Sequence, residues 1–155
     1  MDEVLEGFLA EWDHVRPPRA RITAGAIGVA GPAMGNRVTM TNRPWRLDGD
    51  YLAERFAELK AHPLVGTADT CGFVGGITLV KDKETMAGFD ADLAVGMICR
   101  GHCFKNGLIM RAVGDRMIIA PPLVMTRAQI DEMMVLIRGC LDATLDDLRT
   151  AGQLA

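Results

Sequence analysis

The chain has 155 residues, which is close to the length of one ordinary domain. Its hydrophobic fraction of 49% and charged fraction of 24% exclude extensive disorder, collagen repeats and coiled coils. No apolar run approaches the roughly 20 residues of a membrane span, and the acidic start MDEVLEGF is unlike a signal or transit peptide. We therefore expect a cytoplasmic protein without a membrane partner, and the net charge of −3 gives no general attraction to nucleic acid.

An arginine-rich segment near the N-terminus differs in composition from the rest of the chain. Residues 14–47 contain no Asp or Glu, whereas six arginines occur among residues 16–46. Three explanations remain open: a loosely ordered linker, an arm that binds phosphate or nucleic acid through its arginines, and a shifted reading frame in a GC-rich gene. We divide the chain into an irregular segment, residues 1–47, and a folded domain, residues 48–155.

The folded domain is predicted to begin with a helix and a strand. Asp50 is the expected N-cap of a helix that ends at His62-Pro63, because proline disfavours a helical residue before it. A short extended piece near residues 64–68 then precedes a buried strand at residues 73–80. Residues 81–89 are charged and contain glycine, which predicts a loop.

A second helix and a hairpin are predicted next. Asp92 is the expected N-cap of a helix over residues 93–105, which Asn106-Gly107 ends. Two apolar runs, residues 108–113 and 116–120, flank Gly114-Asp115, and a Gly-X pair of this kind predicts a two-residue hairpin turn.

The last element is a long amphipathic helix. Thr126 and Gln129 have the spacing of a capping box, apolar residues from Ile130 to Leu148 recur at helical spacing, and Gly152 is the expected stop. The order of elements predicts an α+β fold, in which a small mixed or antiparallel sheet carries helices on one face.

Several groups of residues suggest familiar chemistry but lack its full pattern. Cys99, His102 and Cys103 lie close together, yet the paired Cys-x-x-Cys spacing of a zinc site is missing, so we expect no metal and buried, reduced thiols. No nucleotide-binding loop opens a helix, and the absence of serine excludes a serine nucleophile. The remaining candidates in these classes are Gly72, Gly75 and Gly76 at a strand start, and His14, His62 and His102, which occupy no catalytic motif.

Arg111 is the most informative charged residue, because it lies within the apolar run LIMRAV. A charge there is costly unless it is paired or faces a cleft. Two interpretations remain: Arg111 is an outward-facing residue of an edge strand, or its planar guanidinium binds a carboxylate through two parallel hydrogen bonds.

The stretches YLAERFAELKAHPLVG, GFVGGITLVKDK and NGLIMRAVGDRMIIAPPLVMTRAQIDEM resemble the C-terminal small domain of class III aminotransferases that depend on pyridoxal 5'-phosphate (PLP). The omega-amino acid–pyruvate branch of that family is the most similar. The resemblance implies that Arg111 binds the substrate carboxylate. Asp2-Glu3-Val4 followed by Gly7-Phe8 resembles a second family segment, which implies that Asp2 pairs with the pyridine nitrogen of PLP.

The chain departs from the family at the lysine that binds PLP. The family has an I-T-x-A-K-G-like run, whereas this chain reads Ile22-Thr23-Ala24-Gly25, and no lysine occurs before Lys60. We therefore expect a truncated fragment, impaired in moving an amino group from an amine or omega-amino acid to pyruvate, because that lysine holds the cofactor and shuttles a proton. The alternative is a non-catalytic α/β interaction module. Either would self-associate through exposed apolar surface.

Overall fold

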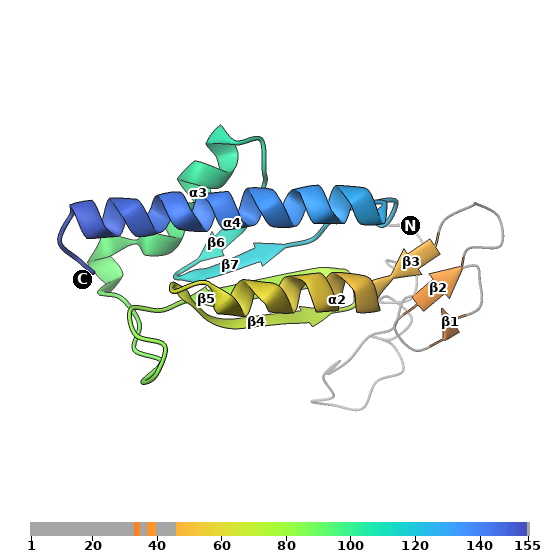
Figure 1. Ribbon diagram of the computed structural model, residues 1–155, viewed down its shortest axis with the longest axis horizontal. Coiled ribbons are helices and arrows are strands. Elements are labelled where there is room, and N and C mark those ends of the chain that lie inside the picture. Colours follow the sequence, from red (N-terminus) through yellow and green to blue (C-terminus); the bar gives the residue numbers. More distant parts are fainter. Residues whose placement is uncertain (1–32, 35–36, 40–45, 155) are drawn as a thin grey trace, which may run out of the picture.

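The computed structural model describes residues 33–34, 37–39 and 46–154 of the chain (Figure 1). Two antiparallel sheets lie in these residues. The smaller sheet has the strand order β1 (Ala33–Met34), β2 (Arg37–Thr39), β3 (Arg46–Asp48). The larger sheet has the order β4 (Val65–Cys71), β5 (Val74–Leu79), β7 (Arg116–Ile119), β6 (Arg111–Val113).

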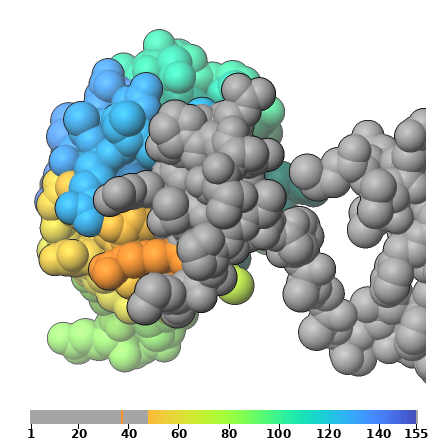
Figure 2. Space-filling view, turned by 90° about the vertical axis from the view of Figure 1, so that its right-hand side faces the viewer, coloured from red at the N-terminus to blue at the C-terminus, as the bar shows by residue number. Residues whose placement is uncertain are grey.

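Helices cover one face of the larger sheet, as the sequence predicts. In Figure 1, α4 runs along the domain with α2 below it and the strands behind both. Figure 2 views the end of the domain where these two helices begin, and the light-blue start of α4 lies beside the yellow start of α2. The described helices are α2 (Gly49–Ala57), α3 (Val95–Lys105) and α4 (Arg127–Thr150), with short 3-10 turns η1 (Glu58–Ala61) and η2 (Ala91–Leu93). No described helix is both long and apolar enough to cross a membrane.

Helix α2 begins two residues earlier than the sequence predicts. The Asp48 side chain, not that of Asp50, accepts a hydrogen bond from the backbone N–H of Tyr51 at 3.2 Å, so the expected cap is wrong. Asp50 lies in the first turn, where a carboxylate still complements the positive end of the helix dipole. The Asp48 carboxylate also binds the guanidiniums of Arg37 and Arg127, which joins the smaller sheet, α2 and α4.

The strand expected at residues 73–80 is confirmed as β5, but the extended piece before it is a full strand. Cys71 of β4 pairs with Val74 of β5 across a tight turn in which Gly72 has a φ of +57°. Such a φ favours glycine because it has no Cβ. The register shifts by one residue between Val65 and Thr67.

Helix α3 begins later than predicted, and Asp92 does not cap it. Asp90 caps the short η2 turn by accepting the backbone N–H of Asp92 at 3.2 Å. Ala94 then adopts a left-handed conformation, with a φ of +48°, and α3 starts at Val95 without a side-chain cap. The expected end of the helix is confirmed, since Asn106 is its C-cap and Gly107 has a φ of +73°.

Helix α4 has the predicted capping box. Thr126 Oγ1 accepts the backbone N–H of Gln129 at 3.3 Å, and the backbone N–H of Thr126 donates to Gln129 Oε1 at 2.9 Å. Its apolar face joins the single core cluster that fills the space between the helices and the sheet. The buried residues of this face are Ile130, Met133, Met134, Ile137, Cys140, Leu141, Thr144, Leu145 and Leu148.

Three of the four cysteines are buried, whereas Cys71 is exposed, which corrects the expectation of four buried thiols. Cys99 and Cys103 of α3 meet Cys140 of α4 inside the core. The hydrogen bond with Cys99, followed by burial, raises the pKa of the Cys103 thiol, and burial raises the pKa of Cys140. These two groups therefore remain thiols that pack as small apolar side chains.

Candidate functional site

The site begins with the predicted hairpin, which the structure confirms. Strands β6 and β7 pair antiparallel, with Val113 opposite Arg116 and Arg111 opposite Ile118. Gly114 supplies the positive φ of +54° that the first position of the turn requires. The hairpin therefore fixes the backbone on which Arg111 lies.

Contacts with α3 and β5 hold the hairpin turn in place. The Asp115 side chain accepts the backbone N–H of Gly96 at 3.1 Å, and the Asp115 carbonyl accepts the backbone N–H of Leu79 at 2.8 Å. A Cβ atom at Gly96 would lie 2.0 Å from the Gly114 carbonyl oxygen. Only glycine at position 96 permits this approach, so the start of α3 and the turn are fitted to one another.

Arg111 points away from the core. Leu108 and Met110 are buried, whereas Ile109 is 76% exposed and Val113 is 52% exposed, so side chains alternate along this stretch. Arg111 follows the exposed series on β6, an edge strand, and is itself exposed. The structure thus bears out the edge-strand interpretation of its location, and the cost of burying a charge does not apply to it.

No carboxylate among the described residues forms an ion pair with Arg111. Within the described part of the chain, no carboxylate therefore occupies the hydrogen-bond donors of this guanidinium, and they can bind a ligand. Exposed apolar side chains flank it at Ile109 and Val113. An arginine between exposed apolar residues on a rigid strand is suited to bind an organic acid, because the apolar neighbours can contact the carbon chain of the acid.

Arg116 is a residue that the sequence interpretation missed. It lies on the same sheet face as Arg111, and its Nη1 donates to Thr78 Oγ1 at 2.8 Å. A Cβ atom at Gly76 would lie 2.6 Å from Arg116 Nη2, so glycine leaves the room that this guanidinium occupies. The alternation of residues 116 and 118 about the buried Met117 was the available signal.

The glycines near β5 make room for side chains and form no phosphate loop. Gly75 faces the covered side, where a Cβ atom would lie 2.8 Å from the Phe56 ring. Gly76 faces the opposite side beneath Arg116. At both glycines the close neighbour is a side chain and not another stretch of backbone.

The structure separates the residues considered for a metal. Cys103 is buried in the core, whereas His102 Nε2 lies 2.7 Å from Asp147 Oδ2 of α4. Among the described residues, no three His, Cys, Asp or Glu side chains gather in a way that could hold a metal ion.

The described residues do not fit PLP, which needs an amine for covalent attachment and a cradle of donors for its phosphate. All four lysines of the chain are described. Lys60 pairs with Asp69 at 3.8 Å, Lys83 donates to the carbonyl of His62 at 3.2 Å, and Lys105 ends α3. Asp2, the residue implied to bind the pyridine nitrogen, lies outside the described residues.

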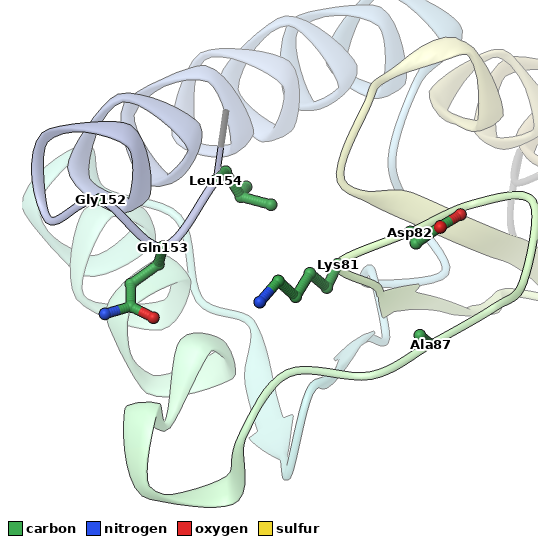
Figure 3. Close-up of a pocket in the computed structure, with 6 residues that line it drawn as sticks. All are labelled: Lys81, Asp82, Ala87, Gly152, Gln153 and Leu154. Atoms are coloured by element: carbon green, nitrogen blue, oxygen red, sulfur yellow. The ribbon is translucent and has the colours of Figure 1, made fainter.

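Lys81 lines an open cavity of about 640 Å³ between the loop after β5 and the C-terminal residues (Figure 3). In Figure 3 the Lys81 side chain points toward Gln153 and Leu154, whereas Asp82 points away from them. The remaining lining residues are Ala87 and Gly152, which provide no second cation. This cavity therefore offers one ammonium group without the cluster of donors that a phosphate requires.

Comparisons with curated proteins identify aminotransferases. The chain is 58% identical over 94 residues to a putrescine–pyruvate aminotransferase of Pseudomonas aeruginosa, covering 61% of this chain and 20% of that protein. It is 30% identical over 153 residues to an adenosylmethionine-8-amino-7-oxononanoate aminotransferase of Nitratidesulfovibrio vulgaris, covering 94% of this chain and 28% of that protein.

A solved structure and a family model are also similar to parts of the chain. A PLP-bound aminotransferase mutant from Vibrio fluvialis matches with a TM-score of 0.61 and 29% identity, covering 64% of this chain and 22% of that one. A family model described as Glucokinase matches residues 1–69, which is less than half of the chain. Of these, residues 49–69 form α2, η1 and part of β4, and they pack in the same core as the rest of the domain.

The structural match agrees with the fold, and the chain spans between 20% and 28% of the lengths of these relatives. The chain therefore belongs to the aminotransferase family.

Proposed function

We propose that residues 48–155 form the substrate-binding small domain of a PLP-dependent aminotransferase, and that Arg111 binds the carboxylate of a pyruvate-like amino acceptor. The position of Arg111 carries this proposal: it lies on a fixed hairpin, is exposed, and has no ion-pair partner among the described residues. Its two parallel N–H donors match the two oxygens of a carboxylate.

Arg111 would orient the acid rather than react with it. A guanidinium remains charged at all physiological pH values and cannot accept a proton, so it has no role as a base. A bidentate contact fixes both the position and the plane of the carboxylate, which places the neighbouring carbon of the acid in one direction. The exposed side chains of Ile109 and Val113 would exclude water from one side of the bound acid.

Residues 1–47 would then be a remnant of the larger, cofactor-binding domain, with Asp2 as the partner of the pyridine nitrogen. The resemblance of Asp2-Glu3-Val4 and Gly7-Phe8 to the family segment supports this assignment. We infer that the 155-residue chain does not transaminate efficiently by itself, since its four lysines belong to the turns, loops and helix of the small domain. Its amino donor would be an amine or omega-amino acid, and its compartment the cytoplasm.

Titration of the 155-residue chain with pyruvate tests the role of Arg111. The signal of the Arg111 Nε–H group in a nitrogen-edited spectrum reports the contact directly. Arg111→Gln is expected to weaken pyruvate binding about tenfold, because a charge-assisted hydrogen bond is lost. Arg149→Gln, at an exposed arginine in the last turn of α4, is the matched control and should change nothing. Equal affinity of the wild type and Arg111→Gln would contradict the proposal.

A second assay tests the catalytic part. The chain is mixed with PLP, an amine donor and pyruvate, and both the absorbance of a protein-bound cofactor and the formation of alanine are followed. We expect neither a covalent cofactor band nor robust turnover. Turnover that disappears when one of the four lysines is replaced would overturn this inference and assign that lysine to catalysis.

A non-catalytic interaction module is the second candidate, favoured by the large apolar side chains that the described surface exposes. Ile109, at 76% exposure, precedes β6, and Val135, at 69% exposure, lies on α4. Apolar surface of this kind promotes association between copies. Sedimentation at several concentrations tests the self-association that both candidates predict, since a monomer at all concentrations counts against each of them. Pyruvate binding that depends on Arg111 distinguishes the first candidate from the second.

A further inference from the structure

The face of the larger sheet that no described helix covers, called the uncovered face below, carries a second arginine beside Arg111. The register of β6 and β7 places Arg111 opposite Ile118 and Val113 opposite Arg116. Arg111 and Arg116 are therefore diagonal neighbours on one sheet face, a relation in which Cα atoms lie roughly 7–8 Å apart and long side chains can reach a common ligand.

The structure holds the Arg116 guanidinium in one place. Its Nη1 donates to Thr78 Oγ1 at 2.8 Å, and the same Thr78 oxygen accepts the hydroxyl of Thr67 at 3.0 Å. The guanidinium lies over Gly76, the one position of β5 on this face where no side chain blocks it. Its Nη2 and Nε donors make no side-chain hydrogen bond to any described residue, so they are available to a ligand.

No described carboxylate neutralises either arginine. The two acidic side chains nearest in register and sequence have other partners: Asp69 pairs with Lys60 at 3.8 Å, and Asp115 accepts the backbone N–H of Gly96 at 3.1 Å. Two neighbouring guanidiniums therefore concentrate positive charge on this face, although the whole chain has a net charge of −3.

We propose that Arg116 is a second carboxylate-binding residue that acts together with Arg111, so that this sheet face binds a dicarboxylate, such as a short keto diacid or amino diacid, in preference to a monocarboxylate. One guanidinium satisfies one carboxylate with two hydrogen bonds, so a second acidic group requires a second cation. This inference rests on the proposed role of Arg111 and names the class of acid that the same site selects.

The test compares succinate with propionate, two acids that differ in a second carboxylate, by titration calorimetry on the full 155-residue chain. The wild type should bind succinate about tenfold more tightly than propionate, the effect expected of one added charge-assisted contact. Arg116→Gln should remove this preference by weakening succinate binding. Arg111→Gln should weaken both acids, and Arg149→Gln should weaken neither.

Thr78→Val keeps the charge of Arg116 but removes its hydrogen-bond acceptor. It should lower the succinate preference by about threefold, because an Arg116 side chain without this hydrogen bond loses more conformational freedom when it binds succinate. This variant also tests the inference if Arg116→Gln fails to fold, which a thermal unfolding curve reveals. A wild type without preference, or Arg116→Gln and Thr78→Val with full preference, would overturn the inference while leaving Arg111 in place. Unchanged binding in Arg111→Gln would instead refute the proposed function.

Discussion

The two faces of the larger sheet, built from alternate residues of the same strands, differ in what they bury. On the covered face, Ile77 of β5 and Met117 of β7 are fully buried beneath the helices. On the uncovered face, Arg116 and Arg111 are exposed. The first face stabilises the domain through apolar burial, and the second leaves its polar groups free for a ligand. A shift of one residue in register would exchange these roles.

The largest test of this difference uses one isoleucine from each face. Ile77→Ala should lower the free energy of unfolding by about 3–4 kcal/mol, because it opens a cavity in a fully buried site. Ile118→Ala, on the half-buried opposite face of β7, should cost about 1 kcal/mol. Urea unfolding of both variants measures the difference. Equal losses would mean that the second face is as well packed as the first.

The contact between α3 and the hairpin turn provides the next test, with two glycines of the same helix. Gly96→Ala should destabilise the domain by about 2–3 kcal/mol, because its Cβ would meet the Gly114 carbonyl oxygen at 2.0 Å. Gly101→Ala has open space and should stabilise the helix by about 0.5–1 kcal/mol. Opposite signs in thermal unfolding are expected. Stabilisation by Gly96→Ala would show that the turn is free to move.

His62 makes the stability of the domain depend on pH. It is 4% exposed, its Nδ1 accepts the backbone N–H of Leu64 at 3.2 Å, and its Nε2 faces Asp142 at 3.2 Å. Burial, opposed by the hydrogen bond with Asp142, lowers the pKa of His62 below its ordinary value of 6.5. The folded state thus favours the neutral ring.

The sign of the pH effect follows from this lowered pKa. The contribution of His62 to the free energy of unfolding is fully present above its unfolded pKa of about 6.5. As the pH decreases from this value toward the folded pKa, the free energy of unfolding falls by at most roughly 1.4 kcal/mol per pH unit. Urea unfolding between pH 8 and pH 5 measures the loss, and His62→Gln should remove the pH-dependent part. The same slope in that variant would assign the effect to another group.

The smallest expected effect concerns Arg111 itself. Arg111→Gln should change the free energy of unfolding by less than about 0.5 kcal/mol, because the side chain is exposed and makes no described ion pair. The same variant should weaken pyruvate binding, so stability and binding separate at this residue. A loss of several kcal/mol would place Arg111 among the residues that hold the fold.

The sequence predicted elements better than their ends. The hairpin and α4 have local signals, Gly114-Asp115 and the Thr126–Gln129 box, which act through their own backbones and therefore need no tertiary information. The predicted starts of α2 and α3 were wrong for different reasons. Asp48 rather than Asp50 caps α2, because the chain enters that helix from β3. No side chain caps α3, because the η2 turn, which Asp90 caps, comes directly before it.

The candidate site was predictable in part. The apolar run around Arg111 indicated a strand, and strict alternation from Leu108 would have shown that the arginine faces outward. The same alternation about Met117 would have placed Arg116 on the outward face, but it could not show the contacts of Arg116 with Thr78 and Gly76 of a different strand. Pairing between distant segments brings these residues together, and a single sequence does not record that pairing.

Asp48 has a practical consequence for where the domain can be separated from the segment before it. Its carboxylate caps α2 and holds Arg127 at the start of α4, so one side chain secures the beginnings of these two helices. A shortened protein that starts at residue 46 keeps these bonds. One that starts at residue 50 loses them, and its two helices should fray from the same end.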